Sequence, residues 1–275
     1  MHQFGAGTHI GNLREHNEDS YVCDAENALW IVADGMGALG SGEAASAIAT
    51  FTITNMIRDG HGVNQAIEVA HSRIREYAES DGHGKNMGTT LVLLLSQGSL
   101  YNVYWVGDSR AYLLSNKDFK QITIDHTLVQ SLIYQGELTI EEAAADPRKN
   151  AVTMALGVHE LENVRADSHS EKWVPGDKIL LCSDGLTDCL TREHIENILR
   201  QEGSDQELTD QLIKAVLDEG GKNNVTIVLV SAPDSTQLTD RETNAPNSIR
   251  NNKAPSQNRN VTQNTNIIDR RGSGS

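Results

Sequence analysis

The sequence has 275 residues, of which 38% are hydrophobic and 22% are charged, and its formal net charge is −15. Such a chain can bury a substantial core, but its acidic excess makes it a poor partner for the phosphate backbone of nucleic acid. Its three cysteines form neither an even set nor a CxxC pair, which excludes a disulfide framework and favours a reduced, cytoplasmic setting.

Short apolar runs rich in β-branched residues predict strands, and several are apolar almost throughout, as in strands buried on both faces. In chain order they are residues 28–33, 89–96, 100–106, 110–114, 178–182 and 225–231. The connection Gln97–Gly98–Ser99 is typical of a hairpin, so the sheets should be mostly antiparallel.

Four stretches with apolar residues at helical spacing lie between these strands, at residues 41–58, 63–80, 191–201 and 204–219. Thr191 is a candidate N-cap for the third stretch, and Gly220–Gly221 closes the fourth. Helices packed outside antiparallel sheets predict an α+β layered fold. Residues 128–148 contain short helical pieces together with Gly136 and Pro147, and we expect them to form a mobile subdomain near the site.

The chain changes character after residue 231. This tail has no aromatic residue, eight asparagines and three of the five prolines, so we predict a folded domain at 1–231 and a disordered tail at 232–275. Six basic and four acidic residues give the tail a charge of +2, which leaves −17 on residues 1–231. No apolar run approaches the roughly 18 residues of a membrane span, and residues 1–8 do not resemble a signal peptide.

Three aspartates end predicted strands and have a glycine beside them, namely Asp34, Asp108 and Asp184, and an acidic pair, Glu18–Asp19, precedes them. We expect the glycines to let the backbone turn sharply, so that carboxylates and a carbonyl can face one ion. Converging carboxylates repel one another unless cations lie among them, and oxygen-only ligands favour Mg²⁺ or Mn²⁺. A single Asp-Gly is more often a turn, so the pattern alone leaves both readings open.

Nine short blocks, spread in order over about residues 5–231, resemble the metal-dependent phosphatases of the protein phosphatase 2C type in their bacterial form. They are LREHNEDS (13–20), VADGMG (32–37), GE (42–43), MGTT (87–90), VGDSRAY (106–112), DHT (125–127), TMALG (153–157), LCSDGL (181–186) and GGKNNVT (220–226). The resemblance implies an α-β-β-α sandwich of two mostly antiparallel sheets flanked by helices. It also implies that residues 128–148 form the family's variable flap, which influences substrate access.

The resemblance further implies two or three Mn²⁺ or Mg²⁺ ions in a cleft at one end of the sandwich. On this reading Asp34 bridges two ions, Gly35 offers its carbonyl, Asp184 binds one of the pair, and Asp108 with Asp184 holds a third, weaker ion. Asn223 stands where the family has a metal-binding aspartate. Because an amide oxygen carries no formal charge, we expect weaker metal affinity there.

Catalytic roles are implied for Asp34 and Asp184, and for Glu18 and Asp19, which would orient metal-bound water. Arg14 would hold the substrate phosphate, since its guanidinium fork matches two phosphate oxygens. Without the motif, a surface salt bridge of Arg14 with Glu15 or Glu18 would be the simpler reading.

The implied activity is hydrolysis of phosphoserine and phosphothreonine in proteins, which opposes a cognate Ser/Thr kinase in the bacterial cytoplasm. Asn223 keeps open a pseudophosphatase that binds phosphoproteins without turnover, and the acidic body argues against the third reading, a nuclease. We expect a monomer with no nucleic-acid or membrane partner. Bacterial members usually carry a histidine just after the aspartate–glycine block; here Ala38–Leu39 follow instead, which leaves the general acid open. His126 fits a structural, hydrogen-bonded role better than a catalytic one.

Overall fold

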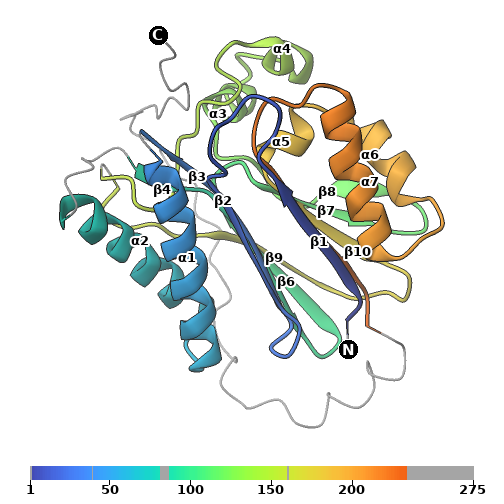
Figure 1. The fold of residues 1–275 in the computed structure, drawn as a ribbon, viewed down its shortest axis with the longest axis horizontal. Helices are drawn as coiled ribbons and strands as arrows, with labels where there is room; N and C mark the ends of the chain where they lie inside the picture. The colour runs from blue at the N-terminus through green and yellow to red at the C-terminus, as the bar shows by residue number, and fades with distance from the viewer. Residues whose placement is uncertain (1, 39, 81–86, 160, 234–275) are drawn as a thin grey trace.

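The computed structural model describes residues 2–38, 40–80, 87–159 and 161–233, and two antiparallel sheets face each other at its centre (Figure 1). Within the described residues, the first sheet has the order β1 (Phe4–His9), β11 (Val225–Ser231), β10 (Lys178–Cys182), β7 (Arg110–Leu114) and β8 (Phe119–Gln121). The second has the order β2 (Asp19–Asp24), β3 (Leu29–Gly37), β5 (Leu91–Gln97), β6 (Leu100–Val106) and β9 (Asp167–Lys172), and β4 (Met87–Thr89) pairs with β3.

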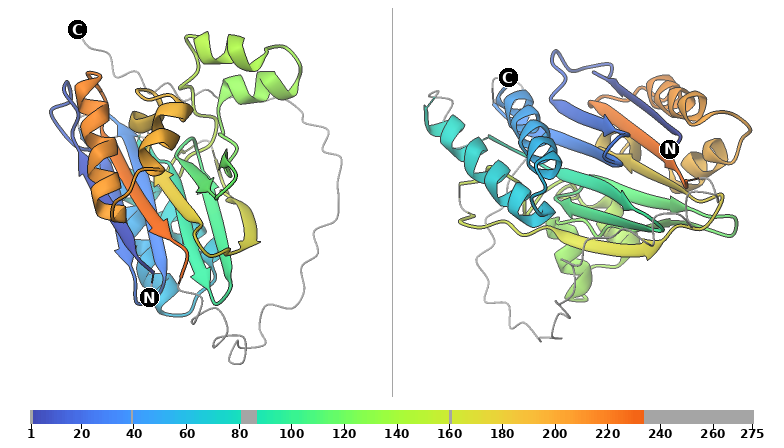
Figure 2. Two further views of the ribbon diagram at one scale, coloured as in Figure 1. Left: turned by 90° about the vertical axis from the view of Figure 1, so that its right-hand side faces the viewer. Right: turned by 90° about the horizontal axis from the view of Figure 1, so that it is seen from below.

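Helices cover the outer face of each sheet (Figure 2). The amphipathic helices α1 (Ser41–Arg58) and α2 (Val63–Ser80) bury their apolar faces against the second sheet. The helices α6 (Arg192–Leu199) and α7 (Asp205–Asp218) do the same against the first sheet. Apolar side chains from both inner faces, including Trp30, Val92, Leu181 and Val228, form the core between the sheets. The predicted layered α+β fold is therefore confirmed.

Three short helices lie at one end of the sandwich: α3 (Leu128–Tyr134), α4 (Ile140–Ala145) and α5 (Asp184–Thr187). The first two belong to residues 128–148, which we call the flap, and they project from the body (Figure 2). The sequence predicted helical pieces there, and the side chains of Thr127 and Thr139 cap them by accepting hydrogen bonds from backbone N–H groups. Thr191 likewise caps α6, as expected from its position.

Two expectations about strands need correction. The run 89–96 was predicted as one strand, but the structure divides it at Thr90 into β4 and β5. Both parts pair with β3, and the Thr90 N–H between them still donates to Asp34 O on β3 (2.9 Å). The run 28–33 was predicted to end before Asp34, but β3 continues to Gly37, since β4 provides an antiparallel partner for its last residues.

None of the helices in the described part of the chain is long and apolar enough to cross a bilayer. Cys182 is buried in β10, where desolvation raises the pKa of its thiol to about 12, in keeping with a core residue. The predicted disordered tail lies, from residue 234 onward, outside the described residues.

A buried histidine on α2 holds the segment that follows the flap. His71 Nδ1 accepts from the Gly157 N–H (3.0 Å), and the opposite ring nitrogen, Nε2, donates to Leu161 O (2.9 Å). This arrangement requires a neutral ring. Burial lowers the pKa of His71, and the Arg75 charge acts in the same direction, against the hydrogen bond to Leu161. The folded chain therefore resists protonation of this side chain.

We predict that the free energy of unfolding falls as the pH drops below about 6.5, the ordinary histidine pKa, because the unfolded chain then takes up a proton that folded His71 resists. The contribution of neutral His71 to the free energy of unfolding is fully present above the pKa that this histidine has in the unfolded chain. It is lost as the pH falls through the lower pKa that His71 has in the folded chain. Urea unfolding near neutral and mildly acidic pH should show a smaller loss for His71→Leu than for the wild type. The exposed-site variant His194→Leu should behave like the wild type, and an identical loss in all three proteins would contradict the assignment.

Candidate metal and phosphate site

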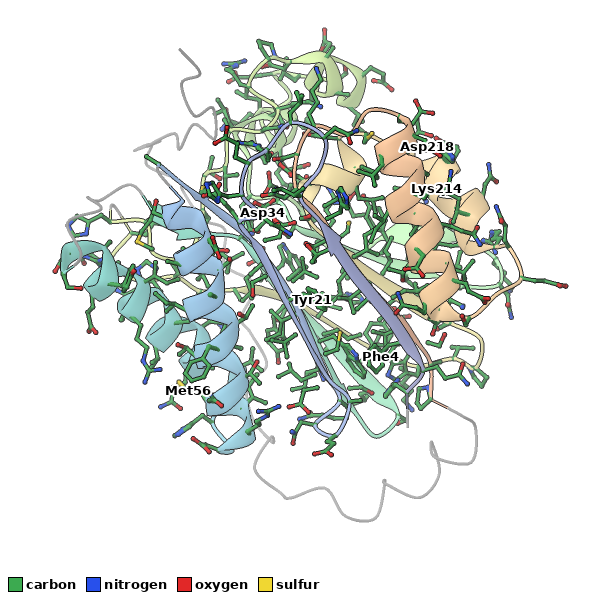
Figure 3. All side chains as sticks on the ribbon, in the orientation of Figure 1. Phe4, Tyr21, Asp34, Met56, Lys214 and Asp218 are labelled. Carbon is green, nitrogen blue, oxygen red and sulfur yellow. The ribbon has the colours of Figure 1, made fainter. Side chains whose placement is uncertain are left out.

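The first two acidic segments meet across neighbouring strands. Asp19 and Asp34 are paired Cα partners of β2 and β3, and the Gly35 N–H donates to Glu18 O (3.1 Å). Figure 3 shows Asp34 toward the end of the sheets that lies nearer the flap helices. Gly35 does not form the sharp turn predicted from the sequence, because β3 runs straight through it. Glycine is required for a different reason: a Cβ there would overlap the carbonyl oxygens of Gly42 and Glu18.

Two hydroxyl groups connect this strand to the segment that carries Asp108. The Asp34 N–H donates to Thr90 Oγ1 (3.2 Å), and Thr90 Oγ1 shares a hydrogen bond of 2.6 Å with Ser109 Oγ. Asp108 follows Gly107, whose φ of +100° lies in the left-handed region. The sequence led us to expect such a turn at a glycine after the aspartate, whereas here it comes before the carboxylate.

A third connection reaches the segment that carries Asp184. Ser183 Oγ donates to Asp19 Oδ2 (2.8 Å) and accepts from the Thr226 N–H (2.9 Å), which fixes the end of β10. Asp184 then opens α5 rather than a turn. Its neighbour Gly185 lies so close to the backbone of the loop before β11 that a Cβ would overlap Asn224 O. These contacts bring the segments of Asp19, Asp34, Asp108 and Asp184 to one end of the sandwich.

Asn223 lies between the predicted phosphate-binding residue and a predicted metal ligand. Its amide N–H donates to Asp184 Oδ1 (2.9 Å), and its amide oxygen accepts from Arg14 Nε (3.1 Å). The amide thus presents a donor to an anion and an acceptor to a cation. Arg14 is otherwise exposed on the loop between β1 and β2, where its fork remains available for a phosphate group.

Glu18 is held from both sides. Its Oε1 accepts from the Gly42 N–H at the start of α1 (3.2 Å), and its own N–H donates to Asn224 Oδ1 (2.8 Å). Burial raises the pKa of the Glu18 carboxyl, although the Gly42 N–H and the charge of Arg14 oppose this shift. Arg14 is thus near enough to Glu18 to influence its charge, as the alternative of a salt bridge between these two residues had supposed.

Asn224 is a residue whose role the sequence did not reveal. Besides binding Glu18, its amide N–H group donates to Ile10 O and His16 O, both at 2.9 Å, so it fixes the loop that carries Arg14. It is only 6% exposed. Ser183 and Thr90 were missed for the same reason, since their partners are distant in sequence. The only signal was their position inside the blocks at residues 87–90, 181–186 and 220–226.

The donor groups at this end of the sandwich suit hard divalent cations. The residues Asp34, Asp108 and Asp184 are 7%, 6% and 6% exposed and offer carboxylates, and Gly35 adds a backbone carbonyl, so the donors are oxygen atoms throughout. Within the described ranges, no three His, Cys, Asp or Glu side chains form a group arranged to hold an ion by themselves. Coordination would therefore have to be completed by carbonyl and water oxygens, and the roles of these residues stay predictions.

The sequence of this chain is similar to those of known phosphatases. The sequence profile of the family Protein phosphatase 2C matches residues 7–224. The serine/threonine phosphatase Stp of Listeria welshimeri is 36% identical over 236 residues, which cover 81% of this chain and 93% of Stp. The serine/threonine protein phosphatase PstP of Mycobacterium tuberculosis is 34% identical over 238 residues, covering 84% of this chain and 45% of PstP.

Solved structures agree with these matches. A crystal structure of M. tuberculosis PstP/Ppp superimposes with a TM-score of 0.78 at 33% identity, and covers 84% of this chain and 98% of that one. The catalytic domain of PstP in complex with two manganese ions gives a TM-score of 0.74 at 33% identity, with coverage of 84% and 97%.

We predict that Asn224→Asp lowers the free energy of unfolding by about 2–3 kcal/mol, because a carboxylate keeps the bond from Glu18 but cannot donate to Ile10 O or His16 O. Asn224→Ala should cost about as much. Asn12→Ala is the matched control, since its amide makes one exposed hydrogen bond, to Leu217 O, from the same loop. Urea denaturation measures all three, and equal effects of Asn224→Asp and Asn12→Ala would refute the anchoring role.

Proposed function

Since this chain belongs to the protein phosphatase 2C family, we propose that the acidic end of the sandwich is where it performs the family's reaction. The chain is a metal-dependent protein serine/threonine phosphatase that uses Mn²⁺ or Mg²⁺ and acts on phosphoproteins. The observation that supports the location is the set of hydrogen bonds through Thr90, Ser109 and Ser183, which joins the segments of three buried aspartates.

In this proposal the three aspartates and one carbonyl hold the ions. Asp34 with the Gly35 carbonyl, Asp184 and Asp108 would be the residues that hold them. When bound, the cations supply a hydroxide nucleophile near neutral pH and offset the negative charge of the phosphate. The rigidity of β3 and β10, both buried, keeps the carboxylates in place while the reaction proceeds.

Other residues bind and orient. Arg14 takes two phosphate oxygens with its guanidinium fork, and Asn224 fixes the loop that presents it. Glu18 and Asp19 accept hydrogen bonds from water and so orient the attacking molecule toward phosphorus. Asn223 would contribute its amide oxygen as an uncharged ligand. The leaving serine or threonine oxygen must gain a proton, and its source is left open.

The proposal also covers the choice between enzyme and binding module, the opposing kinase and the oligomeric state. The relatives that match this chain are named as serine/threonine phosphatases, so the pseudophosphatase reading has no support. We propose that it reverses the action of a cognate Ser/Thr kinase in the cytoplasm, where its three free cysteines would stay reduced. We also propose that it acts as a monomer.

We predict that Asp34→Asn reduces Mn²⁺-dependent hydrolysis of p-nitrophenyl phosphate by about 100-fold or more, since a charged ligand is lost that would hold the cations facing the phosphate. A phosphothreonine peptide should give the same result, and a chelator should abolish wild-type activity. Asp118→Asn, at an exposed aspartate in the turn before β8, should retain activity and serves as the control. Comparable turnover in Asp34→Asn and Asp118→Asn would rule out this location.

We predict that Asn223→Asp binds Mn²⁺ about tenfold more tightly, because a charged ligand replaces an amide. The same change should lower the melting temperature of the metal-free protein, since a carboxylate would then face Asp184 where an N–H now donates. Calorimetric titration with Mn²⁺ and thermal unfolding in chelator measure the two effects. Unchanged affinity together with unchanged turnover would show that Asn223 does not influence the site.

A further inference from the structure

The flap leaves and rejoins the body at one closed base, formed by residues 125–127 and 149–153. Thr127 and Val152 form an antiparallel bridge. The Leu128 N–H donates to Ala151 O (2.9 Å), and the Thr153 N–H donates to His126 O (2.8 Å). These bonds make the flap base a small rigid unit, and the flap helices can move only by moving or deforming it.

The first half of the flap base is bonded to the turn that presents Asp108. The His126 N–H donates to Gly107 O (2.9 Å), and the Gly107 N–H donates back to His126 Nδ1 (3.1 Å). Asp125 accepts a bidentate pair from Arg110, with distances of 2.6–3.0 Å. Residues on both sides of Asp108 are therefore bonded to the flap base, which confirms the structural role expected for His126.

The second half of the flap base is bonded to α5, the helix that begins with Asp184. Lys149 Nζ donates to Asp188 Oδ1 (2.9 Å), and Asn150 Nδ2 donates to Asp188 Oδ2 (2.8 Å). Asp188 lies one turn beyond Asp184, and its N–H donates to Asp184 O (2.8 Å). Both oxygens of the Asp188 carboxylate are thus used to join the flap base to α5.

The chain that leaves the flap base reaches the strand of Asp34 as well. The Thr89 N–H donates to Leu156 O (3.0 Å), and the Leu156 N–H donates to Thr89 O (2.8 Å). Thr89 is in turn the Cα partner of Gly35 in the pairing of β4 with β3. The flap base is therefore bonded to the neighbours of Asp108, through Gly107 and Arg110, and to α5, through Asp188. Its connection to the strand of Asp34 is longer and passes through Leu156 and Thr89.

We propose that Asp188 is a positioning residue through which the flap and the ion-binding aspartates influence each other. This inference rests on the proposed function. A flap held against α5 keeps Asp184 and Asp108 in the arrangement that binds a cation, and a bound cation in turn stabilises the flap base. The coupling must be reciprocal, because both effects are changes in one binding free energy. A contact made only for stability would not change with the cation.

The test compares neighbouring residues on the flap. The double variant K149A/N150A removes both bonds to Asp188, and Arg148→Ala is the matched control, since Arg148 pairs with Asp146 inside the flap. Metal-stripped full-length proteins are titrated with Mn²⁺ by calorimetry. Amide hydrogen exchange of residues 126–129 and 149–153 is followed with and without Mn²⁺, and thermal unfolding in chelator checks that each variant is folded.

We expect Mn²⁺ to slow exchange at the flap base in the wild type and in Arg148→Ala, but not in the double variant. The double variant should bind Mn²⁺ about fivefold to tenfold more weakly, at the lower end of the range of ordinary site-to-site coupling. Asp188→Ala should weaken binding equally, and combining it with the double variant should add nothing. Equal Mn²⁺ affinity in the double variant, the control and the wild type would overturn the coupling. A wild-type chain that binds no Mn²⁺ would overturn the proposed function itself.

Discussion

The central constraint on this structure is the unfavourable free energy of burying several carboxylates together at one end of the sandwich. Asp34, Asp108 and Asp184 are all more than nine-tenths buried, and buried negative charges raise the energy of the folded chain unless donors or cations face them. Two apolar sheets and their helices hold the backbone firmly enough to impose this arrangement. The stability of the core is thus used to position groups that would separate in a looser protein.

The sequence predicted the central strands because their environment is uniform. Residues of β5, β10 and β11 are buried on both faces, so their own side chains report that position. The edge strands gave no such signal. β9 has the sequence DSHSEK and is almost wholly exposed on the described surface, and β1 has the sequence FGAGTH. Each forms a strand because it pairs with a neighbouring strand, β9 with β6 and β1 with β11. Pairing of this kind cannot be read from one segment alone.

The candidate site shows the same division between local and distant information. An aspartate that follows an apolar run can be recognised locally, and Asp34, Asp108 and Asp184 were singled out in this way, although β3 continues past Asp34 to Gly37. The groups that position them could not, because Ser183 is 164 residues from Asp19 and Asn224 is 206 residues from Glu18. The sequence also indicated that a glycine is needed at position 35 but not why. Gly35 was expected to turn the chain, whereas its missing side chain makes room for two carbonyl groups.

Asn223 shows how one uncharged side chain can serve two opposite charges. An amide turns its oxygen toward Arg14 and its N–H toward Asp184, whereas a carboxylate could satisfy only Arg14. The row from Arg14 through Asn223 to Asp184 is therefore electrostatically complementary without any cation. A cation that approached Asp184 Oδ1 would compete with the amide N–H for that oxygen, so ion affinity and preassembly of the site would oppose each other. The amide of Asn223 thus holds Arg14, the proposed phosphate-binding residue, beside Asp184, a proposed ion ligand.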